Sequence, residues 1–480
     1  MLFNTIQYIL FLPFVTAVYF LLPHKVRHVW LLAASWYFYM QWNPKYILLL
    51  AGCTLVTYTG ARILEGMEGA PGRRKAVLFA CLAVNLGILG FFKYYNFGTG
   101  LMNRFLGAVH LPQFPALSII LPVGISFFTL QALGYLIDVY RGDIPAEHDF
   151  IRYALFVSFF PQLVAGPIER SGNLMHQLSE RHTLTYENVR RGLLLILYGL
   201  FLKMVIADRV SPIVDAVYND PASWPGFGVA FATFLFAIQI YCDFYGYSVI
   251  ASGSARILGI RLMSNFEAPF LSASVRELWS RWHISLSTWF RDYLYFPLGG
   301  GRAGLGKKIR NLLIVFGVSG LWHGASLGYV FWGLLNGLFQ SVEAVAQETA
   351  KKGDSKAFPA RIRTFLLFLF SLIFFRAGGM QPAFRTIRYL FSSFNPEILT
   401  GGSFFTLGQG MKDFRILAGA VLVLFLTDLA KYLGKRPDEQ VLACPFPVRY
   451  LVMAGLFFSI ILFGCYGDTY NAQQFIYFQF

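Results

Sequence analysis

Long apolar runs separated by short polar stretches recur from one end of the sequence to the other. A helix needs about 20 apolar residues to cross the hydrocarbon core of a bilayer, with a lower limit near 17. The pattern predicts an all-α, polytopic membrane protein with about twelve spans, several of them shorter than that limit. The predicted spans cover residues 5–22, 29–41, 44–60, 76–95, 118–137, 189–207, 229–250, 309–323, 327–346, 361–376, 414–430 and 448–466.

An apolar segment at residues 153–166 does not fit this series of spans. It is too short to cross, and it is interrupted by Pro161 and by Gly166-Pro167, where helices end. We expect a re-entrant hairpin, because irregular backbone at membrane depth requires protein or a water-filled cavity around it.

Residues 274–295 form a second misfit, because charged side chains alternate there with aromatic ones. The mixture predicts an amphipathic helix that lies at the interface or dips into the protein. On one continuous helix, Trp279, Trp282, His283 and Leu286 would share a face.

The composition restricts the class of protein further. Hydrophobic residues make up 56% of the chain and charged residues 14%, whereas a soluble domain has about 25% charged residues. These values exclude a soluble enzyme, a disordered chain and a small disulfide scaffold. The net charge of +15 is explained by basic residues gathering in cytoplasmic loops. We therefore expect membrane lipids as partners and no nucleic acid.

The loop charges also predict the topology. Lys25 and Arg27 place the first loop inside, and therefore the N-terminus outside. Alternation from there places the C-terminal tail, residues 467–480, outside as well. The polar stretches are too short for a water-soluble domain, and no internal repeat occurs. We therefore expect a single integral membrane domain over residues 1–480, with its chemistry inside the membrane body.

Two of the eight histidines are candidates for chemistry. Arg310 precedes His323 by 13 residues, about 20 Å along a helix, so His323 lies at or beyond the middle of a core about 30 Å thick. An ionisable group at that depth is a functional candidate. The alternative is a neutral core histidine bonded to a neighbouring helix. His283 is the expected partner, although its tryptophan-rich surroundings are also typical of packing.

A pair of histidines suits acyl transfer. One neutral imidazole can take the proton of an attacking hydroxyl group, and the second can orient the acyl group or stabilise the oxyanion. Two histidines are too few for zinc, which usually has three or four protein ligands. The five cysteines form no CxxC pair, so we expect no metal. A Gly-x-Ser-x-Gly elbow is also absent from the sequence.

Several further motifs occur in the sequence: Asn265-Phe-Glu-Ala-Pro-Phe270, Arg276-Glu-Leu-Trp-Ser-Arg-Trp-His283, Leu298-Gly-Gly-Gly-Arg302, His323-Gly-Ala, Phe160-Pro-Gln-Leu-Val-Ala-Gly-Pro-Ile168 and Asp243-Phe-Tyr-Gly-Tyr247. With them, the chain resembles the membrane-bound O-acyltransferases over most of its length. The resemblance is strongest between Asn265 and Asn336, and its nearest branch is the bacterial alginate O-acetylation subunit and related polysaccharide acyltransferases.

The resemblance implies a catalytic segment at residues 262–346 and a central tunnel thinned at the middle of the membrane. His323 would be the general base, and His283 would orient or polarise a thioester. Trp279, Trp282 and Trp322 would line the tunnel. The basic residues that could attract donor phosphates are Arg281, Arg302, Lys307 and Lys308, although the topology explains them equally well.

The resemblance also implies the substrates and the location. The donor would be a cytoplasmic thioester, acetyl-CoA or an acyl carrier, with no bound cofactor. The acceptor would be an exported polysaccharide, modified with the help of a periplasmic acetyltransferase at the bacterial inner membrane.

The sequence ends in Phe475-Ile-Tyr477-Phe-Gln-Phe480, which resembles the Phe-x-Tyr-x-x-Phe endings of some polysaccharide-acylating systems. We expect Tyr477 to carry the acyl group as an ester, since attachment to the enzyme raises its effective concentration. The alternative is an aromatic anchor at the membrane interface.

Two other functions fit parts of the pattern. A transporter would show spaced acidic residues or inverted repeats, and Asp243 is the clearest acidic residue near a span interior. An acyltransferase of the same family that modifies a lipid or a protein would use long acyl chains.

Overall fold

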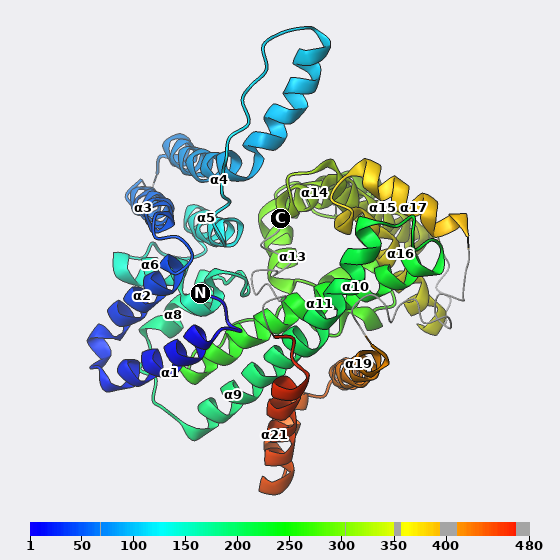
Figure 1. Ribbon diagram of the computed structural model, residues 1–480. Coiled ribbons are helices and arrows are strands. Elements are labelled where there is room, and N and C mark those ends of the chain that lie inside the picture. Colours follow the sequence, from blue (N-terminus) through cyan, green and yellow to red (C-terminus); the bar gives the residue numbers. More distant parts are fainter. Residues whose placement is uncertain (68, 303, 350–356, 394–409, 467–480) are drawn as a thin grey trace. The chain divides into compact units, whose positions relative to one another are not determined.

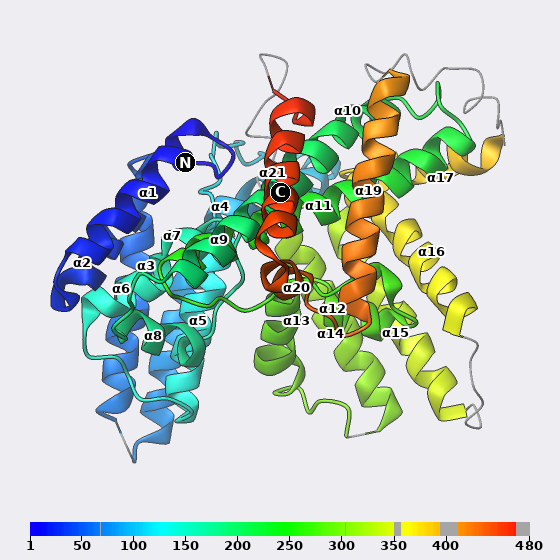
Figure 2. The same ribbon diagram turned by 90° about the horizontal axis from the view of Figure 1, so that it is seen from below.

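A computed structural model of the chain describes all residues except 68, 303, 350–356, 394–409 and 467–480. Every regular element within this part is a helix, which confirms the predicted all-α class (Figures 1 and 2). The chain divides into two compact units, and α9 (Tyr186–Leu200) and α11 (Phe227–Ile257) each begin in one unit and end in the other. Unit 1 contains Met1–Gly192 and Ser254–Met263, and unit 2 contains Leu193–Gly253 and Ser264–Phe480. The single domain over residues 1–480 stays a prediction.

Helices of different lengths follow one another along both units. The helices of unit 1, before α9, are α1 (Ile6–Leu21), α2 (His24–Met40), α3 (Tyr46–Glu65), α4 (Pro71–Ala108), α5 (Ile125–Arg141), α6 (Phe150–Ser158), α7 (Phe160–Leu163) and α8 (Ser171–Ser179). Those of unit 2, besides α9 and α11, are η1 (Phe201–Ala207), α10 (Asp208–Asn219), η2 (Pro269–Leu271), α12 (Val275–Arg281), α13 (Ile284–Phe290), η3 (Arg291–Tyr295), α14 (Leu305–His323), α15 (Leu327–Thr349), α16 (Ala357–Arg376), α17 (Met380–Ser392), α19 (Met411–Tyr432), α20 (Pro437–Ala443) and α21 (Phe446–Phe463).

Each of the twelve predicted spans overlaps one of these helices or two adjoining ones. Within the described residues, five helices are long and apolar enough to cross a membrane on their own. They are α3, α4, α11, α16 from Phe358, and α21. The pair α19 and α20, bent by 97° at its break, is a sixth candidate. A multi-pass membrane protein is therefore confirmed, while the number twelve stays a prediction.

In unit 1, α3, α4 and α5 pack side by side (Figure 1). The segment predicted as a re-entrant hairpin is a broken helix, because α6 ends at Ser158 and α7 contains Pro161. The chain then turns at Gly166, where an added Cβ would lie 2.3 Å from the Gln162 Cα atom. Glycine is thus required for the turn that follows the break.

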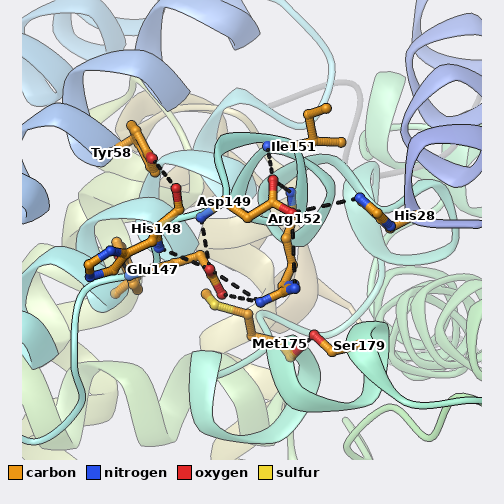
Figure 3. Close-up of polar contacts among 10 residues, drawn as sticks. His28, Tyr58, Glu147, His148, Asp149, Ile151, Arg152, Met175 and Ser179 are labelled. Atoms are coloured by element: carbon orange, nitrogen blue, oxygen red, sulfur yellow. Dashed lines mark hydrogen bonds and ion pairs between the residues drawn. The ribbon is translucent and has the colours of Figure 1, made fainter. Parts of the chain in front are cut away.

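A polar network fixes the start of α6 within unit 1 (Figure 3). The Asp149 carboxylate accepts hydrogen bonds from the Ile151 and Arg152 backbone N–H groups at 2.9 and 3.2 Å. Arg152 also lies 3.3 Å from the Glu147 carboxylate, and His28 lies 3.6 Å from Asp149. These contacts cap the helix, as an N-terminal aspartate commonly does.

In unit 2, α14 and α15 pack closely along much of their length, next to α16 (Figure 2). Two glycines allow the close approach. A Cβ on Gly320 would lie 2.2 Å from the Tyr329 carbonyl oxygen, and one on Gly333 would lie 2.1 Å from that of Phe316. Small residues permit such backbone contacts between membrane helices, so this pair forms a tightly joined hairpin.

A buried ion cluster holds η1, α10 and α11 together in unit 2. The Lys203 Nζ atom lies 2.8 Å from Asp208 Oδ1 and 2.6 Å from Asp243 Oδ1, and all three side chains are buried. Asp243, the acidic residue that a transporter could have used, is therefore engaged in an internal ion pair.

Candidate active site

His323 is the last residue of α14. The helix ends there because Gly324 adopts an extended backbone. A Cβ on Gly324 would lie 2.2 Å from the Tyr329 ring, so only glycine leaves room for that ring. The His-Gly pair of the sequence thus marks the end of α14, where the Tyr329 ring of α15 packs against Gly324.

One hydrogen bond determines the tautomer of the His323 ring. Its Nδ1 atom lies 2.6 Å from the Ser319 carbonyl oxygen, one turn earlier on the same helix. A carbonyl can only accept, so Nδ1 carries the proton in the neutral ring and Nε2 carries the lone pair. His323 therefore has the form in which an imidazole can act as a general base.

Aromatic rings surround His323. The centroids of Trp322 and Trp332 each lie 4.9 Å from that of the imidazole, and Phe375 lies at 5.8 Å. His323 is only 4% exposed. The ring is thus held in an apolar environment, in which electrostatic interactions are stronger than in water.

The region around His283 differs from the sequence prediction. In place of one amphipathic helix over residues 274–295, α12 ends at Arg281 and α13 begins at Ile284. Between them His283 adopts a left-handed backbone with φ of 44°, which is unfavourable for a residue other than glycine. The prediction that Trp279, Trp282, His283 and Leu286 share one helical face is therefore wrong.

Asn265 holds the chain in this unusual conformation. Its carbonyl oxygen accepts a hydrogen bond from the Ile284 N–H at 2.9 Å. Its Oδ1 atom accepts from the Ser285 N–H at 3.2 Å and from the Ser285 hydroxyl at 2.6 Å. Three bonds from one residue thus fix the start of α13 and, with it, the backbone of His283.

The structure brings the two histidines together. Their ring centroids lie 6.5 Å apart, and the Phe244 ring lies 4.6 Å from that of His283. His283 is completely buried. Burial lowers the pKa of His283 well below its ordinary value, and the neighbouring His323 lowers it further. The uncharged form of His283 is therefore strongly favoured.

A cavity of about 530 Å³ lies beside this site in unit 2. Trp279, Phe316 and Ser319 form part of its wall, so it extends to the residue whose carbonyl holds His323. Its basic lining residues are Arg276, Arg291 and Lys308. The two histidines are not among the lining residues, so the cavity ends one helical turn short of the His323 ring.

Of the three predicted tunnel tryptophans, Trp279 lines the cavity. Trp322 packs against both histidines, with its centroid 4.9 Å from that of His323 and 6.0 Å from that of His283. Trp282 packs instead on Phe266 at 5.1 Å and on Phe368 at 5.2 Å.

The predicted phosphate-attracting residues are likewise divided. Lys308 lines the cavity, whereas Arg302 and Lys307 are exposed and are not among its lining residues. Arg281 forms an ion pair with Glu277 at 3.0 Å and lies over the Tyr432 ring. Tyr477 lies outside the described residues. No group of three His, Cys, Asp or Glu side chains suited to a metal occurs in the part of the chain that the structure describes.

Sequence reasoning missed four residues of this region: Asn265, Arg276, Arg291 and Trp332. Asn265 stands in the sequence only as the start of a motif, although its side chain holds Ser285, 20 residues later. Arg276 and Arg291 lie in the segment taken as one helix, and no spacing rule separates them from the other basic residues. Trp332 lies in a predicted span, where a tryptophan is expected to pack.

Comparisons with known proteins identify the family. Residues 143–374 match the membrane-bound O-acyltransferase family. A probable alginate O-acetylase of Pseudomonas aeruginosa is 38% identical over 387 residues, covering 80% of this chain and 73% of the relative. A peptidoglycan O-acetyltransferase of Helicobacter pylori is 34% identical, covering 81% and 79%.

A more distant relative is a teichoic acid D-alanyltransferase of Bacillus subtilis, 27% identical over 257 residues that cover 50% of this chain and 63% of the relative. The matched family segment contains both histidines and the cavity beside them. The extent and identity of these matches show that the chain belongs to the membrane-bound O-acyltransferase family and is an O-acetyltransferase.

Proposed function

We propose that this enzyme O-acetylates an exported cell-surface polysaccharide with acetyl groups taken from a cytoplasmic thioester. The observation that carries the proposal is the bond from His323 Nδ1 to the Ser319 carbonyl oxygen, at 2.6 Å, which leaves the basic lone pair on Nε2. Relatives that are named alginate and peptidoglycan O-acetylases support a polysaccharide acceptor.

In the proposed reaction, His323 Nε2 takes the proton of the acceptor hydroxyl group while the hydroxyl oxygen attacks the thioester carbonyl carbon. Collapse of the tetrahedral intermediate expels the thiolate, which receives the proton from the imidazolium. Such general base assistance contributes about 10²–10⁴-fold. His283, 6.5 Å away between ring centroids and favoured in its neutral form, would orient the thioester.

The cavity is the proposed entry for the donor. Arg276, Arg291 and Lys308 line it and would bind phosphate groups of acetyl-CoA or of an acyl carrier. The thioester arm would pass Trp279 and Ser319 to reach His323, with Trp282 and Trp322 excluding water from the inner end. Arg281, Arg302 and Lys307 would add only to the general positive field.

The proposed topology places the Lys307-Lys308 loop in the cytoplasm and both chain termini outside, at the bacterial inner membrane. Donor and acceptor would then meet at His323 from opposite sides. A periplasmic acetyltransferase would receive the acetyl group and pass it to the polysaccharide.

An assay with purified protein tests the reaction. Acetyl-CoA is supplied in detergent together with polysaccharide from cells that lack the gene, and release of free thiol is followed with transfer of labelled acetyl groups. We expect both activities in the wild type and neither in His323→Ala. A protein that moves acetyl-CoA without releasing thiol would be a transporter, and transfer only from long-chain donors to lipid or protein would indicate the other branch of acyltransferases.

We also propose that Tyr477, in the C-terminal tail at residues 467–480, accepts the acetyl group as a phenyl ester and presents it to the external partner. Mass spectrometry of the C-terminal peptide after incubation with acetyl-CoA would detect the adduct. Tyr477→Phe should remove it, whereas Tyr470→Phe in the same tail should not. Full polysaccharide acetylation by the Tyr477→Phe variant would exclude the relay.

A further inference from the structure

Trp332 presents an unusual donor within the active site. Its side chain is 2% exposed, and its Nε1–H has no hydrogen-bond acceptor among the residues that the structure describes. Buried polar groups are nearly always paired, and an exception in a native protein calls for an explanation. Trp279, a buried tryptophan that lines the cavity, instead donates its N–H to the Asn336 Oδ1 atom at 3.2 Å.

The position of this donor is fixed next to the proposed base. The Trp332 ring lies 4.9 Å from that of His323, at an interplanar angle of 74°. Phe375 packs on another side at 4.9 Å. The Trp332 carbonyl oxygen also accepts a hydrogen bond from Asn336 Nδ2 at 2.8 Å. Asn336 thus bonds to the Trp279 indole and to the Trp332 backbone.

We propose that the Trp332 Nε1–H is an oxyanion donor of the acetyl-transfer reaction. This inference rests on the proposed function. When the hydroxyl oxygen attacks the thioester carbon and its proton moves to His323 Nε2, the carbonyl electron pair moves onto the carbonyl oxygen. The indole N–H donates to that oxygen, and the electron pair returns when the thiolate leaves with the proton from His323.

The chemistry of indole suits this task. An indole N–H only donates, so it does not compete with His323 for the hydroxyl proton. The rings of Trp322 and Phe375 pack against His323 and exclude water. A fixed donor in a water-excluded site stabilises developing negative charge far more than the same group does in water. Because the Trp332 N–H has no acceptor among the described residues, it need not break another hydrogen bond before it donates to the negatively charged carbonyl oxygen.

Trp332→Phe tests the inference, because it keeps an aromatic ring and removes the N–H together with part of the indole ring, a loss of volume that Trp30→Phe reproduces elsewhere in the chain. The probe is acetyl-CoA, with polysaccharide from cells lacking the gene as the acceptor. We expect kcat to fall about 10²–10³-fold, as for removal of other oxyanion donors, with KM for acetyl-CoA changed by less than about threefold. The pH profile should keep its shape, because the base is unchanged.

Trp30→Phe is the matched control, since the Trp30 N–H donates to the Val15 carbonyl oxygen at 3.1 Å in unit 1. We expect Trp30→Phe to retain wild-type kcat and to lower the melting temperature, because it leaves a carbonyl without its donor. Trp332→Phe should lower the melting temperature by no more than Trp30→Phe does, since both lose the same indole volume and Trp332 gives up a donor that has no acceptor among the described residues.

Two results would overturn the inference. One is a kcat for Trp332→Phe within threefold of wild type while His323→Ala is inactive, which would leave the proposed function intact. The other is a loss of kcat accompanied by a melting temperature well below that of Trp30→Phe, which would assign the N–H a structural role such as a contact with a ring face. A wild-type enzyme without His323-dependent transfer would contradict the proposed function itself.

Discussion

The two histidines of the active site are held in contrasting ways. His323 is oriented by a carbonyl four residues earlier on its own helix, and its helix ends at a glycine that only a neighbouring ring fills. His283 lies in a gap between two short helices with a left-handed backbone, and it depends on Asn265, which lies 18 residues earlier. A local contact supports the first ring, and a long-range contact supports the second.

This difference suggests how each ring can fail. The His323 orientation survives any change that leaves α14 intact, because its bond lies within the helix. The His283 conformation is strained by itself, and it persists only while the bonds from Asn265 outweigh the strain. Substitutions can therefore disturb the support of one histidine and leave that of the other intact.

Removal of the His323 ring should have the largest effect. His323→Ala is expected to reduce acetyl transfer by about 10²–10⁴-fold, because the proposed general base is lost. Thiol release from acetyl-CoA measures the effect. His176→Ala serves as a control, since that side chain is largely exposed and forms only a long ion pair with Glu180 at 3.9 Å. Normal transfer by His323→Ala would show that this ring is a structural histidine.

Separating α14 from α15 should come next. In Gly320→Ala the new Cβ would lie 2.2 Å from the Tyr329 carbonyl oxygen, so the backbones must move apart. Overpacking of this kind costs about 1–3 kcal/mol, and we expect a lower melting temperature and an activity loss of at least tenfold. Gly419→Ala in α19 meets no atom within 4 Å and should change neither. Equal behaviour of the two variants would contradict the close packing described above.

Loss of the hydrogen bonds from Asn265 to Ser285 should affect His283 and leave His323 unchanged. Asn265→Ala removes the two bonds to Ser285, each worth about 0.5–1.5 kcal/mol, and we expect roughly a tenfold decrease in kcat. Asn265→Asp keeps the Oδ1 acceptor and should recover part of the loss, whereas Asn265→Leu should not. If Asp and Leu behave alike, the acceptor does not hold the His283 backbone.

Smaller effects are expected at the cavity. Arg291→Ala and Lys308→Ala should each raise KM for acetyl-CoA by a few-fold with little change in kcat, because they line the cavity far from the reacting atoms. Higher salt should reduce the difference from wild type. Lys307→Ala is the matched control, since Lys307 is the exposed neighbour outside the cavity lining. A change in kcat but not in KM would exclude donor binding there.

The smallest effect concerns pH. The pKa of His283 is lowered well below its ordinary value by burial and by His323, so the folded protein keeps this ring neutral while the unfolded chain binds a proton below about pH 6.5. The free energy of unfolding should therefore fall below pH 6.5, by at most about 1.4 kcal/mol per pH unit from this residue. Melting curves of wild type and His283→Asn at pH 7.5 and 5.5 measure the contribution. An identical pH dependence of both proteins would mean that His283 titrates normally.

The sequence was a good guide where a local rule applied. Apolar run lengths predicted the helical membrane fold, Pro161 predicted the break between α6 and α7, and the position of His323 in its span marked it as a candidate. The predicted span 309–323 also ends where α14 ends, at His323. Each of these features depends on residues within one or two turns.

Features that depend on distant residues were missed. The break at Trp282–His283 contains neither proline nor glycine, and it exists because Asn265 binds the chain beyond it. The unpaired Trp332 N–H can be recognised only when every neighbouring acceptor has a known position. Likewise, only the fold separates Arg276 and Arg291, which line the cavity, from Arg281, which is paired with Glu277.

The glycine contacts between α14 and α15 also bear on how the enzyme can evolve. At positions 320 and 333 even a methyl group would meet a backbone carbonyl at 2.2 or 2.1 Å. No substitution can be tolerated there by rearranging side chains alone, because both obstacles are main-chain atoms. A side chain at either position therefore requires the α14 and α15 backbones to move apart, which the rest of the enzyme would have to accommodate.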